Sequence, residues 1–396
     1  MRRRTSNPGA WAIVDLDALE YNYREIVRRV GSDVRVIASI KANAYGFGAV
    51  ACAKRLEKAG SFALATGNVE EAIAVREAGV GLPILMFGGF LPADVPRLLQ
   101  HNLIPTLYNK EMAETVSAAA AREVEVYVKV ECGLGRLGVP LEEAFAYIGS
   151  IHALPNLRVA GVYTHLPFFD AASRARSERQ LKGFDDLAAG LEQSGIGPLV
   201  TQALASSAVL EGLTDRCNAV CVGHLLYGLS PMAPGEADLS AFRPVLKEVG
   251  ARLIHVGHHP AGGDIGMGGL YGIAKAMKIG VIPLGMQNGM RAPAPGKTAE
   301  VLIRGRRVPS IGVSLEHMTI DLSALATPVL EETVLVLGAM AGAQPIDLED
   351  LAVWRSSAPL EVAMTLSDRI PTIFADGEQH SSTDLQSNLV SQTSVS

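Results

Sequence analysis

The chain has few aromatic residues, few cysteines and no long hydrophobic run. Only 5% of its 396 residues are aromatic. No apolar segment approaches the ~18–20 residues that cross a bilayer, so we expect no membrane partner. The cysteines follow none of the spacings of zinc sites or redox motifs, and we therefore expect reduced thiols in a cytoplasmic protein without a metal site. They are Cys52, Cys132, Cys217 and Cys221.

An excess of positive charge is also missing. The formal net charge is −6, whereas a nucleic-acid-binding protein normally presents a basic surface, so we expect no nucleic-acid partner. The basic start MRRRTSN lacks the apolar segment that a secretory signal requires. Hydrophobic residues make up 48% and charged residues 19% of the chain. This balance is typical of a globular protein, here long enough for two domains.

Short apolar segments alternate with helix-like segments from about residue 11 to residue 240. Eight strands separated by helices at roughly 20–30-residue intervals predict a parallel (β/α)8 barrel, with an open doubly wound sheet as the alternative. The expected strands are Val34–Ile40, Phe62–Thr66, Ile84–Phe87, Leu103–Leu107, Val124–Val130, Val159–His165, Leu199–Leu204 and Ala219–Gly223. Three expected helices are Glu70–Gly79, Glu111–Arg122 and Arg176–Leu191.

The texture changes after residue 240. Glycine and proline separate β-rich segments with few helix signals, which predicts a mainly antiparallel domain over residues 241–377. Its β-rich segments are Val245–Val256, Met277–Gly285, Ala299–Ile303, Pro309–Leu322 and Thr333–Gly338. Residues 378–396 are rich in Ser, Thr and Gln, and we expect a disordered tail there.

The segment VRVIASIKANAYGFG, from Val34 to Gly48, is the most informative part of the chain. Six of the seven residues before Lys41 are apolar or small, as in a strand buried on both faces, and a sharp exit into a loop follows. A lysine at the rim of a buried strand is poorly hydrated, which lowers its pKa. Its neutral amine is then able to condense with an aldehyde, as in lysines that hold pyridoxal phosphate.

This segment resembles the cofactor-lysine motif of the alanine racemase family, and the resemblance extends from about Trp11 to Phe374. It implies a (β/α)8 barrel followed by a β domain, which an N-terminal strand within residues 10–16 would join. It also implies pyridoxal 5′-phosphate as cofactor, a small amino acid as substrate, and a homodimer in which the second domain completes the partner's site. Lys41 would bind the cofactor as a Schiff base, and Tyr45 would contact its phosphate.

Further motifs match the cofactor half of the family's site. In VKVECGLGRLGV, the resemblance implies that Lys129 is a buried structural lysine, carbamylated in some members. Arg136 would contact the cofactor's phenolic oxygen, where a guanidinium also binds a carboxylate through two hydrogen bonds. In GVYTHL, His165 would pack on the cofactor ring. The segments ASSAVLEG and VCVGHLLYGLSP supply the remaining phosphate ligands, namely Ser207 and the backbone amides of Gly223 and His224.

Three departures from the family pattern affect the chemistry. Cys221 stands where the family has an arginine beside the pyridine nitrogen, so a positive charge is lost. A gap-free count places Met267 where the family has its second catalytic base, a tyrosine from the partner subunit, and a thioether transfers no proton. Tyr271 lies four residues on, roughly 13 Å along a strand.

The third departure lies in the expected substrate wall, which the partner subunit would supply. Met286 replaces a tyrosine, and Leu315 and Glu316 replace a methionine and an aspartate. Racemisation normally requires a base on each face of the substrate, and only Lys41 is evident. We therefore expect a repurposed enzyme catalysing elimination, replacement, cyclisation or transamination.

Two alternatives remain. The first is a racemase or epimerase in which Tyr271, Glu316, His317 or water serves the second face. The second is a pyridoxal-phosphate-binding protein without turnover.

Overall fold

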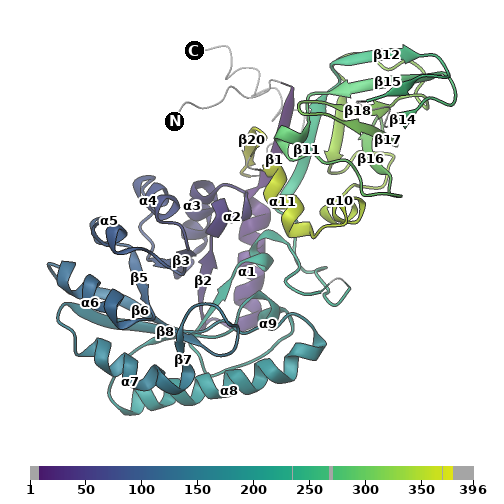
Figure 1. Cartoon of the computed structure of the whole chain (residues 1–396). Helices are drawn as coiled ribbons and strands as arrows, with labels where there is room; N and C mark the ends of the chain where they lie inside the picture. The colour runs from purple at the N-terminus through teal and green to yellow at the C-terminus, as the bar shows by residue number, and fades with distance from the viewer. Residues whose placement is uncertain (1–8, 234, 267–270, 368, 378–396) are drawn as a thin grey trace. The chain divides into compact units, whose positions relative to one another are not determined.

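The computed structural model describes residues 9–233, 235–266, 271–367 and 369–377, which form two compact units (Figure 1). One unit comprises Ala18–Ala44 and Gly48–Arg243. The other takes in the chain up to Asp17, the short segment Tyr45–Phe47, and the chain from Pro244 onward. None of the helices in these ranges is long and apolar enough to cross a membrane.

Eight parallel strands close into a barrel in the first unit. The ring runs β2-β3-β4-β5-β6-β8-β9-β10 and returns from β10 to β2, which confirms the predicted (β/α)8 architecture and excludes the open sheet. The strands are β2 (Arg35–Ser39), β3 (Ala63–Thr66), β4 (Ile84–Met86), β5 (Ile104–Leu107), β6 (Val124–Glu131), β8 (Leu157–Tyr163), β9 (Val200–Gln202) and β10 (Ala219–Val222). A two-residue strand, β7 (Val139–Pro140), adds to β6.

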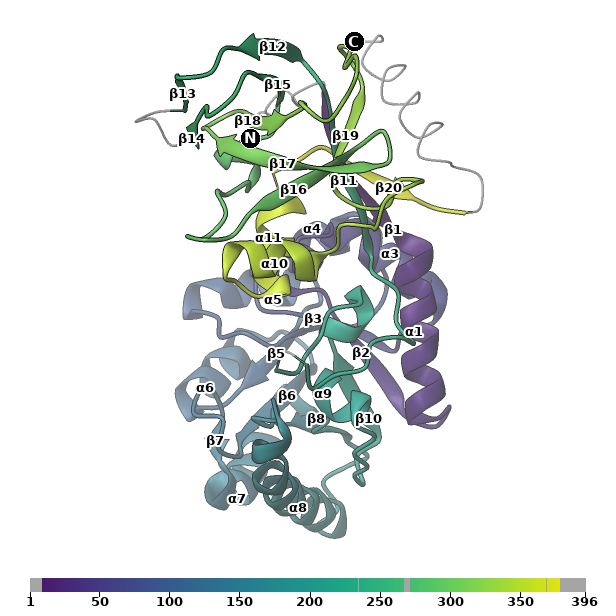
Figure 2. The same cartoon turned by 90° about the vertical axis from the view of Figure 1, so that its right-hand side faces the viewer.

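Helices connect these strands, and side-chain caps start several of them. Asn68, Asn109 and Asp170 each accept a hydrogen bond from a first-turn backbone amide, which satisfies a donor that the helix itself leaves unpaired. Two of the helices, α7 and α8, run side by side outside the strands (Figure 2). The bounds are α1 (Leu16–Val30), α2 (Lys41–Tyr45), α3 (Ala49–Ala59), α4 (Val69–Glu77), η1 (Pro92–Asp94), α5 (Val95–Gln100), α6 (Lys110–Ala119), α7 (Leu141–His152), α8 (Ala171–Gln193), α9 (Ser206–Leu210) and η2 (His224–Tyr227).

A mainly antiparallel nine-stranded sheet forms the second unit, as the sequence predicts. Its order is β12-β15-β18-β17-β16-β19-β11-β1-β20, and only β1 and β20 pair in parallel. The bounds are β1 (Ala10–Asp15), β11 (Leu246–Arg252), β12 (His255–His259), β15 (Met277–Ile282), β16 (Ala299–Ile303), β17 (Arg306–Val313), β18 (Met318–Asp321), β19 (Thr333–Leu337) and β20 (Thr372–Ala375). The strands β13 (Asp264–Ile265) and β14 (Tyr271–Gly272) pair with each other in a separate two-stranded sheet.

Two helices of this unit were missed by the β-rich interpretation of the sequence. They are α10 (Leu348–Arg355) and α11 (Pro359–Ser367), which pack against each other (Figure 2). The side chain of Asp347 caps α10 by accepting a hydrogen bond from the Asp350 amide. This N-cap signal is present in the sequence, but the surrounding strands obscure the short helical period. A further short turn, η3 (Met286–Asn288), follows β15.

Two glycines of the barrel unit differ in how much space an added Cβ would have. A Cβ at Gly161 would lie 2.2 Å from the Tyr127 ring in the barrel core, whereas a Cβ at Gly149 in α7 meets no atom within 4 Å. We expect Gly161→Ala to lower the free energy of unfolding by about 1–3 kcal/mol through overpacking. Gly149→Ala should raise it by up to ~1 kcal/mol, because alanine is the better helix former. Urea denaturation of both variants measures this, and equal effects would contradict the packing.

Candidate active site at the C-terminal end of the barrel

Lys41 leaves the barrel directly after β2, as predicted. The Ile40 amide donates to the Ala65 carbonyl at 2.8 Å, which extends the pairing of β2 with β3 up to the lysine. The buried phenol of Tyr227 donates to the Ser39 carbonyl at 2.9 Å. The backbone on both sides of the strand end is therefore fixed, and Lys41 emerges among the C-terminal ends of the strands, where barrels of this type carry their active sites.

The residues that follow Lys41 form a left-handed turn. Ala42, Asn43, Ala44 and Tyr45 have φ angles of 54°, 55°, 54° and 57°, and we call α2 (Lys41–Tyr45) the lysine turn. Each such residue costs about 1–2 kcal/mol relative to a right-handed conformation. Tyr45, the predicted phosphate contact, is the buried last residue of the turn. This conformation persists only if the surroundings hold it, and such strain is common at functional sites.

Hydrogen bonds hold the lysine turn at several points. The Ala44 amide donates to the Ile40 carbonyl at 2.7 Å. The Asn43 side chain accepts from the Ala49 amide at 2.8 Å, at the start of α3. The Asn43 amide donates to the carboxylate of Glu71, which also accepts from the Thr66 hydroxyl. Glu71 was not predicted, because its only local signal is an acidic residue in the first turn of α4.

Electrostatic effects connect the predicted barrel residues into one cluster. Partial desolvation lowers the pKa of Lys41, the Arg136 guanidinium lowers it further, and the Cys221 thiol acts in the opposite direction. The Lys41 side chain remains exposed. The structure thus brings together the lysine that follows β2, the arginine that follows β6 and the thiol on β10.

Lys129 is the buried lysine that the sequence predicts. It is 4% exposed and its ammonium lies 5.3 Å from the centre of the Tyr163 ring. Burial lowers its pKa to about 8, Arg136 and Lys41 lower it as well, and Glu131 and Cys221 oppose them. A neutral amine close to an arginine is also the species that carbamylation requires.

The two predicted histidines and Cys221 are uncharged at neutral pH. Desolvation lowers the pKa of His165 to about 4, and Arg136, Lys129 and Lys41 contribute. Desolvation with a contribution from Lys41 lowers the pKa of His224 to about 4. Burial raises the pKa of the Cys221 thiol to about 12 against the influence of both lysines. Positive charge in this cluster therefore comes from Arg136 and from whatever fraction of the lysines is protonated.

Backbone hydrogen bonds shape the loop that carries Arg136. The carboxylate of Glu131 accepts from the Arg136 amide at 3.1 Å and from the Gly133 amide, which folds the loop back onto the end of β6. Gly138 is required for this close approach, because its φ is 136° and a Cβ would lie 2.6 Å from the Glu131 nitrogen. Arg136 itself is exposed, so its guanidinium is available to a ligand.

The predicted phosphate-binding residues meet at the ends of β9 and β10. The Ser206 hydroxyl accepts from the Gly223 amide at 3.0 Å, so Ser206 joins the two segments that contain Ser207 and Gly223. Ser207 is 8% exposed, and His224 begins η2 directly after Gly223. Ser207 was predicted and Ser206 was not, because the adjacent serines are indistinguishable until their side-chain directions are known.

The predicted substrate wall lies in the second unit. Met286 and Leu315 are 51% and 64% exposed, and two backbone hydrogen bonds of 2.9 Å join their loops, from Met286 to Ser314 and from Gln287 to Leu315. Glu316 is exposed in the same turn as Leu315.

The candidates for the second base lie in different elements of the second unit. His317 closes the turn that contains Leu315, since its carbonyl accepts from the Ser314 amide. Tyr271 lies in β14 instead and packs against the cluster of Ile273, Met277 and Ile279. Met267 falls outside the described residues.

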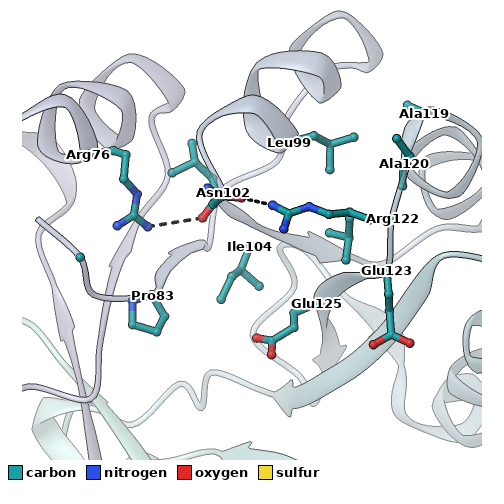
Figure 3. Close-up of a pocket in the computed structure, with 14 residues that line it drawn as sticks. Arg76, Pro83, Leu99, Asn102, Ile104, Ala119, Ala120, Arg122, Glu123 and Glu125 are labelled. Carbon is teal, nitrogen blue, oxygen red and sulfur yellow. Dashed lines mark hydrogen bonds between the residues drawn. The ribbon is translucent and has the colours of Figure 1, made fainter. Parts of the chain in front are cut away.

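A cavity of about 680 Å³ opens at the N-terminal end of the barrel strands, opposite the candidate active site. Figure 3 shows residues that line it. It is lined at the N-terminal ends of strands, by Pro83 before β4, Ile104 at the start of β5 and Glu125 in β6. Arg76 and Arg122 both donate to Asn102 within it. Because catalytic residues of such barrels lie at the other end, this cavity is not the candidate active site.

Two family models match most of the chain. The model "Alanine racemase, N-terminal domain" matches residues 14–231, and the model "Alanine racemase, C-terminal domain" matches residues 246–374. An alanine racemase of Halothermothrix orenii is 30% identical over 377 residues, which is 94% of this chain and 98% of the relative. One of Synechocystis sp. is 32% identical over 371 residues, 92% of this chain and 98% of the relative.

Solved structures agree with these sequence matches. The alanine racemase of E. faecalis superimposes with a TM-score of 0.84 at 28% identity, covering 93% of this chain and 98% of its own. The alanine racemase of Bacillus anthracis with bound L-Ala-P gives 0.83 at 27% identity, covering 94% and 96%. Both comparisons include the barrel and the β unit.

The pKa of Lys129 predicts a pH-dependent stability. Between about pH 8, its value in the fold, and pH 10.5, its ordinary value, the unfolded chain binds a proton that the folded chain does not. Stability therefore rises with pH in this range, by on the order of 3 kcal/mol. Lys129→Met should lack this rise, whereas Lys182→Met, at an exposed ion pair with Asp186, should keep it.

Urea denaturation of the three proteins across that pH range measures the difference. Parallel curves for wild type and Lys129→Met would contradict a neutral buried amine. They would favour a carbamylated Lys129, whose negative charge does not titrate there.

Proposed function

Because the chain belongs to the alanine racemase family, we propose that it is a pyridoxal-phosphate enzyme that moves the Cα proton of an amino-acid substrate. Lys41 is the base on one face of the substrate. The observation that carries the proposal is the lowered pKa of Lys41 at the C-terminal end of β2, next to Arg136. A lysine whose pKa is lowered gives up its proton more readily, as a general base must.

The residues of the barrel end fit the cofactor of this family, pyridoxal 5′-phosphate. Lys41 would hold its aldehyde carbon, and the hydrogen-bonded segments of Ser207 and Gly223 would bind its phosphate. Arg136 would contact the ring oxygen, and neutral His165 would pack on the ring. When bound, the cofactor withdraws electrons from the substrate's Cα and so makes its proton acidic.

The Arg136 guanidinium favours binding of the carboxylate of an amino-acid substrate. Arg136 is exposed and binds a substrate carboxylate with two parallel hydrogen bonds. Desolvation lowers the pKa of Lys41, and the positive charge of Arg136 lowers it further. Cys221 stays a neutral thiol, because burial raises its pKa to about 12.

We further propose that the outcome differs from ordinary racemisation of alanine. The motive is the sequence: Met267 occupies the position of the second base in a gap-free count, and Cys221 that of an arginine. Protonation from the Lys41 side alone returns the starting enantiomer, which leaves elimination, replacement, cyclisation or transamination as productive reactions. The exposed Met286 and Leu315 suit the interface of a homodimer, and sedimentation measures that assembly.

Racemisation of alanine is the second candidate function. The relatives that carry the name alanine racemase match over 92–94% of this chain, which favours it. The second base would then come from Tyr271, Glu316, His317 or water. Tyr271 is the direct test, because its phenol is the same functional group as the family's base.

Lys41 should be the attachment point of the cofactor. We expect the violet absorbance of lysine-bound pyridoxal phosphate in the purified protein, and its loss in Lys41→Ala. Lys54→Ala, at an exposed position of α3, is the matched control and should keep the absorbance. Borohydride reduction followed by peptide mass spectrometry identifies the labelled lysine. A reduced cofactor retained in Lys41→Ala would place the attachment elsewhere and refute the site.

Proton exchange at Cα separates the two candidate outcomes. In D2O, an amino acid that is a substrate should exchange its Cα proton with retention, at a rate ~10²–10⁴-fold above its conversion to the other enantiomer, because one general base is missing. Met267→Tyr should increase enantiomer conversion, and Met267→Phe, which adds a ring without a hydroxyl, should not. Chiral chromatography with mass detection over a panel of amino acids measures both rates.

Equal exchange on both faces of alanine in the wild type would refute the single-face proposal. Loss of that exchange in Tyr271→Phe would assign Tyr271 as the second base. A stable cofactor complex without exchange for any amino acid would indicate binding without turnover.

A further inference from the structure

We propose that Glu71 is a positioning residue that holds the lysine turn in its left-handed form and thereby fixes the position of the Lys41 amine. The inference rests on the proposed function of Lys41 as the cofactor lysine. Glu71 contacts Asn43, which lies 28 residues before it in sequence and two residues after Lys41. It touches neither reacting atoms nor substrate in this role.

The lysine turn needs a hydrogen-bond acceptor near its start. Four consecutive residues after Lys41 are left-handed, and none of them is glycine. At the start of any helical turn the first amides have no partner within the turn. The Asn43 amide is one of these, and the Glu71 carboxylate accepts its hydrogen bond. A charged acceptor gives a stronger bond than a neutral one, which suits a conformation that is otherwise disfavoured.

Hydrogen bonds hold Glu71 itself in place. Its backbone amide donates to the side chain of the N-cap residue Asn68 at 3.0 Å, in the first turn of α4. A carboxylate is favoured there by the helix dipole. Its other oxygen accepts from the hydroxyl of Thr66, which is 1% exposed at the end of β3. The carboxylate thus connects the lysine turn to a rigid strand end and to a helix.

The preceding residue, Glu70, has a different partner from Glu71. Glu70 is on the same first turn of α4, but its carboxylate pairs with Arg97 at 2.6 and 2.7 Å on the surface, where the Glu70 side chain is 73% exposed. Surface ion pairs of this kind contribute little to stability. Adjacent glutamates therefore have different roles, and Glu70 is a matched control for Glu71.

Further hydrogen bonds link the lysine turn to the next helix, α3. The Gly48 amide donates to the Asn43 carbonyl at 2.9 Å, and the Asn43 side chain accepts from the Ala49 amide at the start of α3. Displacement of Asn43 would therefore shift the whole connection from β2 to α3. Because Lys41 is the first residue of that connection, its amine would move with it.

The experiment uses the full chain with and without pyridoxal phosphate. In Glu71→Ala we expect the Asn43 amide to exchange with deuterium at least tenfold faster, and cofactor affinity to fall at least tenfold. Glu71→Gln keeps one acceptor oxygen and should show intermediate effects. Glu70→Gln should change neither quantity. Fragmentation mass spectrometry resolves the amide, and absorbance titration gives the affinity.

A glycine provides the rescue. Ala42 is exposed and has a φ of 54°, which glycine adopts without steric cost. Ala42→Gly should therefore restore part of the cofactor affinity in the Glu71→Ala background and change it little in the wild type. A general loss of folding would appear instead as a lower melting temperature without rescue, and this result would overturn the proposal.

Two further outcomes are decisive. An Asn43 amide whose exchange is unaffected by Glu71→Ala would refute the contact as a constraint on the turn. Faster exchange without a change in cofactor affinity would refute its role in positioning Lys41. Amide exchange of Asn43 in the cofactor-free chain does not depend on the reaction. It therefore tests the role of Glu71 separately from the proposed function, which the labelling experiment on Lys41→Ala tests.

Discussion

The candidate site depends on a backbone constraint, the left-handed turn that follows β2. Ala42, Asn43 and Ala44 have no intrinsic preference for this conformation strong enough to maintain it, so the surrounding hydrogen bonds must do so. These come from the end of β2, the start of α3 and the first turn of α4. The position of Lys41 is thus determined by the barrel scaffold rather than by its own neighbours in sequence.

A second organising feature is the suppression of charge around that lysine. Burial and the Arg136 guanidinium act in the same direction on Lys41, Lys129 and His165. The pKa of each of these three groups therefore lies below its ordinary value, and the Arg136 side chain itself is exposed. A site of this kind attracts an anionic ligand to one defined point and leaves an amine free to accept a proton nearby.

The barrel was predictable because its strands are buried on both faces and read as short apolar runs at regular intervals. The lysine and arginine were predictable because each lies in a continuous local motif. Glu71 and Ser206 were not, since their partners lie 28 and 17 residues away and only packing determines where the side chains point. Helices α10 and α11 were missed because they are short and lie among strands.

The closure of the barrel between β10 and β2 has a consequence for biosynthesis. Lys41 directly follows the first strand of the ring, whereas the Tyr227 phenol that bonds to Ser39 lies just after the last. A chain emerging from the ribosome therefore contains its lysine long before the barrel that desolvates this lysine is closed. Because desolvation in the folded barrel lowers the pKa of Lys41, its amine is a better nucleophile in the folded chain than in the unfolded one.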